Sequence, residues 1–322
     1  MKKLTFSLLL IASIITLFSF KKEATYQIYT DDIDHFWEAY DSLAFAKTTN
    51  DSVAIIDRLY FGRATVGLKA YRVARPNTPL MHIESIRQYP KYWRSVRPMT
   101  MLAKTSKSVV AGIFQKYQSF IPNFRKTNVC FAIGCINSGG TTDANWVFIG
   151  TEIASADSTV DKSEMSGMFK DLIGTGSGDM TNMIAHEAIH TQQISMILQE
   201  ENPKEDSFYG TLINEGVADF IPYLLFKTKI NEGAYAYGRK NECALWQQLQ
   251  ADLAKNDTKL WFYNGMSIKD RPADVGYFMG FRIAEAYYNK QKNKREALDI
   301  LLKSRDYAAI VAQSGYNGGC SK

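Results

Sequence analysis

Two histidines four residues apart, in a segment with helical patterning, constrain the fold of this chain more than any other feature. Residues 183–190 read MIAHEAIH, with Glu187 directly after His186. Positions i and i+4 of a helix stand on one face about one turn apart, so His186 and His190 can reach one metal ion while Glu187 flanks it. The chain has four histidines, and two fall into this motif. The motif alone leaves a second interpretation open, because a helical histidine can also be an ordinary surface or core residue.

A second helical segment supplies two acidic side chains with the same spacing. Residues 213–220 read INEGVADF, which puts Glu215 and Asp219 four apart on one face. A catalytic zinc ion needs three protein ligands and an open position for water, and His186, His190 and Glu215 make such a set. Metal-bound histidines usually donate their other ring nitrogen to a carboxylate, so Asp219 is the predicted partner of His186. Alternatively, both acids are ordinary first-turn residues that the helix dipole favours.

Apolar periodicity predicts an α+β fold that is mostly helical. We expect a helical N-terminal region over residues 21–125, and a second region over 126–322 that contains both motifs. Within the second region, the patterns predict a small sheet over 128–153, helices over 180–227 that carry the motifs, and C-terminal helices over 235–302. The motif helices are expected over 180–198 and 214–227, and the first C-terminal helix over 235–253.

Two segments of the expected sheet alternate as strands do. Val129, Phe131 and Ile133 alternate with smaller residues, and a second β-like run spans residues 146–153. We expect these two segments to be neighbouring strands. The Gly-Gly-Thr-Thr at 139–142 is predicted to be a turn and not a phosphate-binding loop, because no P-loop lysine follows it.

The first 20 residues have the pattern of an export signal. Two lysines precede an uncharged, mostly apolar run over residues 4–20, and two more lysines follow it. The run is short for a membrane span, which favours a cleaved signal peptide over residues 1–20 and a periplasmic or extracellular protein. An uncleaved anchor is the alternative, since no small-residue cleavage pattern follows the run. Only in that case do we expect contact with a membrane or attachment to the cell envelope.

The formal net charge of +5 is dispersed along the chain, with no long basic stripe. This argues against a nucleic acid as partner. The short basic cluster over residues 290–295 is explained by a solvated helix end. The pattern carries no signal for an oligomeric state.

Four cysteines are expected to lie in an oxidising compartment, which allows three pairings. Cys130 and Cys135 lie five apart in an alternating run, which sends them to opposite faces and disfavours a bond between them. A bond between Cys243 and Cys320 would tie the C-terminal tail to the body. The alternative is four small buried hydrophobic residues.

The two motifs together resemble those of the thermolysin-like gluzincins. In that family the glutamate of an Asn-Glu-x-x-x-Asp motif is the third zinc ligand and its aspartate supports a histidine. The resemblance assigns these roles to Glu215 and Asp219, with Asn214 beside them. Here 24 residues separate His190 from Glu215, somewhat more than in thermolysin.

A closer resemblance covers most of the chain. DHFW at 34–37, FAIG at 131–134, IGTE at 149–152 and GYFMG at 276–280 are similar to segments of a family of predicted zinc-dependent proteases that includes gliding-motility-associated lipoproteins. One departure from the lipoproteins is that no cysteine follows the signal run, since the first is Cys130. Lipid anchoring is therefore not expected.

The resemblance implies an exported zinc metallopeptidase on a zincin-like fold, with residues 126–322 as catalytic region. The implied cofactor is Zn²⁺ and the implied substrate is a peptide or protein. Glu187 is then the general base for a zinc-activated water. Tyr277, at the start of a predicted helix, is our candidate donor to the oxyanion, and a merely buried aromatic is the alternative.

Zincins bind substrate as an extra strand on an exposed sheet edge. Residues 145–150 could be that edge, or could lie inside the sheet. A second functional hypothesis is a catalytically silent cell-envelope interaction protein, related to gliding motility, that keeps the zincin fold. The intact Glu187 favours the enzyme hypothesis, because a site without catalytic activity does not require a general base between its histidines.

Overall fold

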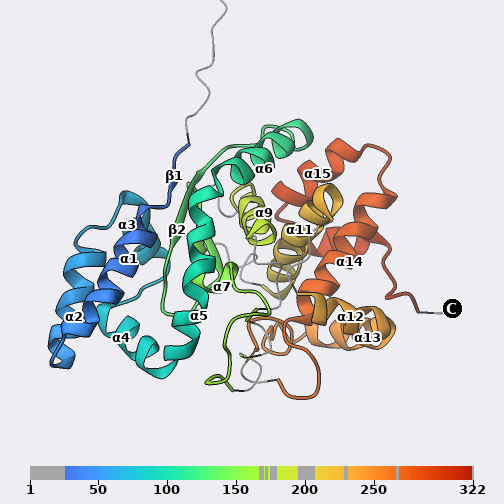
Figure 1. Ribbon diagram of the computed structural model, residues 1–322. Coiled ribbons are helices and arrows are strands. Elements are labelled where there is room, and N and C mark those ends of the chain that lie inside the picture. Colours follow the sequence, from blue (N-terminus) through green and yellow to red (C-terminus); the bar gives the residue numbers. More distant parts are fainter. Residues whose placement is uncertain are drawn as a thin grey trace, which may run out of the picture.

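A computed structural model describes residues 26–166, 170, 173–174, 180–194, 207–227, 231–265 and 268–320. The chain is α+β, with one small four-stranded sheet among many helices (Figure 1). The predicted signal peptide, residues 1–20, lies outside the described residues, so it stays a prediction. Within the described part, no helix combines the length and the apolarity that a membrane crossing requires.

Helices occupy most of the chain between Asp31 and Phe120, on the left of Figure 1. The sequence starts them with standard signals: Thr48, Thr65 and Thr78 cap three of these helices through their hydroxyls. The α-helices of this region are α1 (Asp31–Ser42), α2 (Thr49–Ile56), α3 (Val66–Ala74), α4 (Pro79–Gln88), α5 (Pro90–Thr100) and α6 (Lys107–Phe120). The shorter helical segments are η1 (Leu43–Phe45), η2 (Asp57–Phe61) and η3 (Met101–Thr105).

The sheet has the strand order β1-β2-β4-β3. Strands β1 (Ile28–Tyr29), β2 (Asn128–Ala132) and β4 (Trp146–Gly150) are parallel, and β3 (Gly140–Asp143) pairs antiparallel with β4. The expectation that β2 and β4 are neighbours is confirmed, and β4 lies inside the sheet. The antiparallel strand β3 is at the edge of the sheet.

Two expectations for the sheet are wrong, and a further strand, β1, was not expected. Residues 140–143 form a strand and not a turn, because pairing with β4 through the backbone needs no apolar alternation, and all four residues are half-buried. Strand β1 has two residues, which is too short for apolar alternation to predict it. The run 146–153 ends at Gly150 and continues as α7 (Thr151–Ala154), where Glu152 turns inward and accepts hydrogen bonds from the amides of residues 134 and 136.

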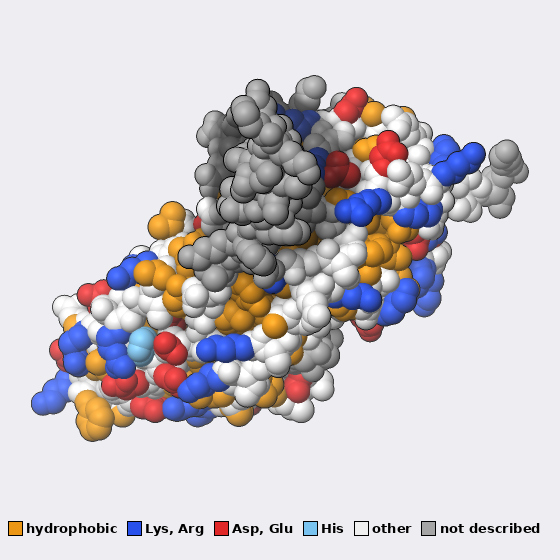
Figure 2. All heavy atoms as spheres, turned by 90° about the horizontal axis from the view of Figure 1, so that it is seen from above, with side chains coloured by type: hydrophobic (Ala, Val, Ile, Leu, Met, Phe, Trp, Pro, Cys, Tyr) orange, Lys and Arg blue, Asp and Glu red, His pale blue; other side chains and the backbone are white. Residues whose placement is uncertain are grey.

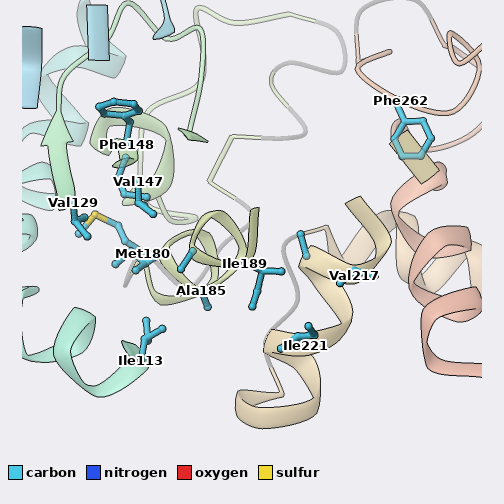
Figure 3. Packing of buried hydrophobic residues seen from close by; sticks show 14 of the residues in the cluster. Ile113, Val129, Val147, Phe148, Met180, Ala185, Ile189, Val217, Ile221 and Phe262 are labelled. Atoms are coloured by element: carbon cyan, nitrogen blue, oxygen red, sulfur yellow. The ribbon is translucent and has the colours of Figure 1, made fainter. Parts of the chain in front are cut away.

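The core is built around α9 (Thr181–His190), which packs against the sheet, α6 and α11 (Phe208–Phe226). Figure 3 shows apolar side chains from β2, β4, α6, α9 and α11 gathered around this helix. Ile184 and Ile189 of α9 are fully buried, and burial of such a side chain contributes about 1.5–3 kcal/mol. Tyr117 of α6 donates a hydrogen bond to the backbone oxygen of Ala185 at 2.9 Å. The helix with the first motif is therefore held rigidly in the centre of the fold.

The second motif lies on α11, whose neighbour is α14 (Val275–Lys290). These helices touch backbone to backbone: a Cβ on Gly216 would lie 2.1 Å from the carbonyl carbon of Gly280. Only glycine allows this approach, which fixes the position of Glu215 next to Gly216. The predicted start of the helix near Asn214 is wrong, because α11 begins at Phe208 with Ser207 as its cap. Glu215 is therefore not a first-turn residue, and the helix-dipole explanation for it is excluded.

The C-terminal part is helical, as the sequence predicts. The predicted run from Tyr235 to Leu253 is interrupted at Asn241, which gives two helices. The remaining helices are α12 (Glu232–Lys240), α13 (Glu242–Leu253), α15 (Lys294–Lys303) and α16 (Tyr307–Ser314). A disulfide joins Cys243 to Cys320, as expected.

The other two cysteines, Cys130 and Cys135, are free, which agrees with the expectation that they do not pair. Charges on the surface are mixed: on the face that Figure 2 shows, Lys and Arg side chains alternate with Asp and Glu side chains over the described residues.

Candidate metal centre

Helices α9 and α11 bring the three predicted ligands together. His186, His190 and Glu215 each offer one ligand atom, and these atoms lie within 4.8 Å of one another. The two Nε2 atoms are 3.0 Å apart. Glu215 Oε2 lies 3.4 Å from Nε2 of His186 and 3.3 Å from Nε2 of His190. All three side chains are buried or half-buried. The helices that carry them, α9 and α11, lie side by side near the centre of Figure 1.

Asp219 lies where the second motif predicts it. Its Oδ1 is 2.8 Å from Nδ1 of His186, and its Oδ2 accepts a hydrogen bond from the hydroxyl of Tyr235 at 2.7 Å. An ionised carboxylate only accepts, so Nδ1 of His186 carries the proton. The lone pair of the neutral imidazole is then on Nε2, which faces Glu215.

Gln193 orients the second histidine and was not among the predicted site residues. Its Oε1 lies 2.9 Å from Nδ1 of His190, and its Nε2 donates to the backbone oxygen of Asn214 at 2.8 Å. That donation fixes the amide orientation, because a carbonyl can only accept. Asn214 contributes here through its backbone oxygen. The predicted helix over 180–198 ends at His190, and the turn that follows presents Gln193 to the ligand.

The donor set fits a metal cation. With both Nδ1 atoms protonated, the two Nε2 lone pairs and a carboxylate oxygen converge on one point, which is repulsive unless positive charge lies between them. Glu215 Oε2 is also buried and has no hydrogen-bond partner among the described residues. Two histidines and one carboxylate form a ligand set of catalytic zinc sites.

Electrostatics favour positive charge within the cluster. Burial opposes the charge of His186, yet the hydrogen bond to Asp219 and the nearby Glu215 carboxylate raise its pKa well above the ordinary value. Burial likewise opposes ionisation of Glu215, but positive charge on His190 and His186 lowers its pKa well below the ordinary value. The cluster thus stabilises an ionised carboxylate with a positive charge beside it, which protons on the histidines or a metal cation can supply.

Glu187 stands beside this cluster, and its carboxylate has no hydrogen-bond partner within the described ranges. Burial raises its pKa, and the charges of His186 and His190 partly oppose this. The first residue of β3 is close to it: a Cβ on Gly140 would lie 2.4 Å from Oε1 of Glu187. A glycine at this position therefore makes room for the carboxylate at the sheet edge.

Tyr263 reaches the cluster from a loop and was not among the predicted site residues. Its hydroxyl donates to Oε1 of Glu215 at 2.5 Å. The backbone of Tyr263 has a positive φ of 53°, and the next residue is clamped: Asn264 N donates to Asp274 Oδ1, while Asp274 N donates to Asn264 Oδ1. No periodic pattern marks such a loop residue, so the sequence offered no signal for it.

Tyr277 lies in the same area. It is on the first turn of α14, with its ring centroid 6.1 Å from that of His186 and 6.5 Å from that of Tyr263. Burial raises the pKa of Tyr277 well above the ordinary value, so the hydroxyl keeps its proton. The structure therefore brings two tyrosine hydroxyls to the site, of which Tyr263 contacts a ligand directly.

A cleft of about 710 Å³ opens over the cluster. Its lining comes from three parts of the fold. Helix α9 contributes Met183, His186 and Glu187; the N-terminal half of the chain contributes Arg75, Ile136–Gly140 and Ile153; the C-terminal part contributes Asn231, Tyr263, Asp274 and Tyr277. A volume of this size is typical of sites that bind small molecules or peptide segments.

A buried two-histidine, one-carboxylate cluster beside an unpaired glutamate, under an open cleft, is the arrangement of metal-dependent hydrolases. A protein-family model described as "Predicted Zn-dependent protease (DUF2268)" matches residues 168–304, which is less than half of the chain but includes both motifs. No curated protein matches the chain. No solved structure matches it either. The match supports zinc as the metal and proteolysis as the class of reaction.

Proposed function

We propose that this chain is a zinc-dependent peptidase of the gluzincin type, on a zincin-like fold. His186, His190 and Glu215 hold the zinc ion, and Glu187 is the general base. The observation that carries the proposal is the convergence of three ligand atoms within 4.8 Å, with the Glu187 carboxylate left free beside them. The family match supports the same class.

When bound, zinc supplies a Lewis acid and lowers the pKa of a coordinated water towards about 7. Glu187 takes the proton of the attacking water and delivers it to the leaving amine. A raised pKa, which burial gives to Glu187, suits this work because the base must hold the proton before releasing it. Asp219 and Gln193 keep each imidazole in the tautomer that directs Nε2 to the metal.

The oxyanion of the tetrahedral intermediate needs a hydrogen-bond donor besides the metal. Tyr263 is our first candidate, because its hydroxyl already lies at Glu215. A phenol with its ordinary pKa of about 10 keeps its proton at neutral pH, so Tyr263 remains a donor there. Tyr277, which the sequence suggested, packs its ring edge-on against that of Tyr263.

The substrate binds as an extended strand along β3. β3 pairs with β4 on one side, and no described strand pairs with its other side. Its first residue, Gly140, lies next to Glu187, so a peptide on this edge passes over the general base. The candidate edge at residues 145–150 is replaced by β3, because β4 is inside the sheet.

Export to the periplasm or the extracellular space is part of the proposal. The disulfide between Cys243 and Cys320 supports an oxidising compartment. A relation to gliding-motility-associated lipoproteins is supported by the sequence resemblance.

The test uses the chain without its first 20 residues, loaded with zinc, on casein and on a peptide library. We expect cleavage by the wild type and a loss of about a hundredfold or more in Glu187→Gln, the range of general-base removal, with zinc content retained. Glu84→Gln is the matched control, because Glu84 is exposed on α4. Equal behaviour of wild type and Glu187→Gln in every assay would favour the silent interaction protein instead.

A further inference from the structure

One wall of the cleft carries a cation that the proposed chemistry does not use. Arg75 directly follows α3 and lines the cleft together with Glu187 and Asp274. Its side chain is exposed and has no ion-pair partner in the part of the chain that the structure describes. The carboxylates of the lining residues, by contrast, are buried or half-buried. Arg75 is therefore available to an anionic group that enters the cleft.

The backbone around Arg75 is fixed, although the side chain is free. Arg75 N donates to the backbone oxygen of Tyr71 at 2.7 Å, and the buried Asn77 donates to the backbone oxygen of Arg75 at 3.0 Å. Pro76 follows, which restricts the backbone of Arg75 to extended conformations. The guanidinium group therefore extends from a defined point on the wall.

The surroundings of Tyr71 indicate which of the lining residues lie near Arg75. A Cβ on Gly134 would lie 3.0 Å from the hydroxyl of Tyr71 and 3.2 Å from Oδ1 of Asn137. The hydroxyl of Tyr71 on α3 thus lies close to Gly134, and Arg75, one turn further along the chain, lines the same cleft as Ile136 and Asn137. Residues 136–139 also line the cleft and lead directly into β3.

The direction of β3 then places Arg75 relative to the bond that is cleaved. β3 begins at Gly140, beside Glu187, and runs towards Asp143. A peptide that pairs antiparallel with β3, the more stable pairing, has its N-terminal part along Thr141–Asp143. Its C-terminal part lies along residues 136–139, on the side of Arg75.

We infer that Arg75 binds a carboxylate of the substrate on the C-terminal side of the scissile bond. This inference rests on the proposed peptidase function. The carboxylate can come from an aspartate or glutamate side chain or from a free C-terminus, because the guanidinium recognises both through the same paired hydrogen bonds.

The test starts from one peptide that the wild type cleaves. Three versions are made: a neutral peptide with a C-terminal amide, the same peptide with a free C-terminus, and the amide with glutamate on the C-terminal side of the cleaved bond. The kcat/KM of each version is divided by that of the neutral one. We expect at least one ratio of about tenfold or more in the wild type, the strength of a charge-assisted hydrogen bond. Which version has the higher ratio identifies the source of the carboxylate.

Arg75→Gln should bring the higher ratio close to one. Arg75→Lys should keep part of it, because lysine retains the charge without the planar fork. Lys69→Gln is the matched control: it removes a positive charge from an exposed position of α3 that does not line the cleft, and the ratio should stay as in the wild type.

A binding measurement adds a readout that does not depend on turnover. The Kd of the three peptides for zinc-loaded Glu187→Gln should follow the same order, and should become equal when Arg75→Gln is added. If the wild type cleaves no peptide, the proposed function fails and this inference with it. If the wild type cleaves but Arg75→Gln leaves the ratios unchanged, only the inference about Arg75 is overturned.

Discussion

Gln193 links the second histidine of the metal cluster to the neighbouring helix. Its oxygen lies 2.9 Å from Nδ1 of His190, and its nitrogen donates to the backbone oxygen of Asn214, which directly precedes Glu215. One side chain therefore couples a ligand on α9 to the backbone next to a ligand on α11. This contact joins the two helices at the ligand cluster.

Gln193→Ala should weaken zinc binding about 10- to 100-fold, the usual cost of losing a residue that orients a ligand. The fold should persist, because α9 and α11 keep their apolar contacts. Zinc affinity from competition with a chelator is the measurement, with Gln115→Ala on the exposed face of α6 as control. Unchanged affinity in Gln193→Ala would mean that His190 is oriented without it.

Tyr263→Phe removes one hydroxyl and leaves the ring in place. If this hydroxyl donates to the oxyanion, kcat should fall about 100-fold or more, as for other oxyanion donors, while KM changes little. Tyr277→Phe should cost less, because Tyr263 and not Tyr277 contacts the ligand Glu215 directly. The reverse order of the two losses would restore Tyr277 as the donor.

Gly140→Ala tests the space that β3 leaves for the general base. The added Cβ would lie 2.4 Å from Oε1 of Glu187 and 2.7 Å from the sulfur of Met183, so both must move. We expect a strong loss of kcat with zinc content retained, since the metal ligands are not displaced. Thr142→Ala, two residues along the same strand, should remain close to the wild type. Full activity of Gly140→Ala would mean that the Glu187 carboxylate can shift and still act, so that Gly140 does not set its position.

The buried carboxyl group of Glu152 should make the stability of the fold depend on pH. Burial raises its pKa from 4.5 to about 7, although the amides of Gly134 and Ile136 oppose this. The folded state therefore binds a proton that the unfolded state releases between these two values, so stability falls as pH rises through this window and stays lower above it. The raised pKa corresponds to a contribution of about 3 kcal/mol.

Denaturant unfolding of wild type and Glu152→Gln at pH 5 and pH 8 checks this. The wild type should lose more stability between the two pH values than the variant, because glutamine does not ionise. Comparison of the two proteins cancels the titration of the metal cluster, which they share. Equal pH dependence would mean that Glu152 is already ionised at pH 5 in the fold.

Residue spacing was sufficient to bring four side chains of the site together. His186, His190, Glu215 and Asp219 were predicted as a group, because spacing on a helix fixes which side chains share a face. The strands β2 and β4 were predicted because apolar alternation marks buried strands.

The parts that were missed depend on the backbone and on long-range contacts. Gln193 reaches His190 only because α9 ends at the motif, and helix ends are weakly encoded by local pattern. Tyr263 depends on a loop with positive φ that Asn264 and Asp274 hold in place. The edge strand β3 is polar and pairs through its backbone, so no apolar alternation in the sequence predicts it.

Zinc stoichiometry of the purified chain, compared between wild type and Glu215→Ala, tests the three-ligand site most directly. We predict about one zinc ion per chain in the wild type, the ligand set of a single catalytic site, and a sharp fall in affinity in the variant. Glu84→Ala, on the exposed face of α4, should bind zinc as the wild type does. Tight binding that Glu215→Ala leaves unchanged would contradict the site, because the third ligand would then lie elsewhere.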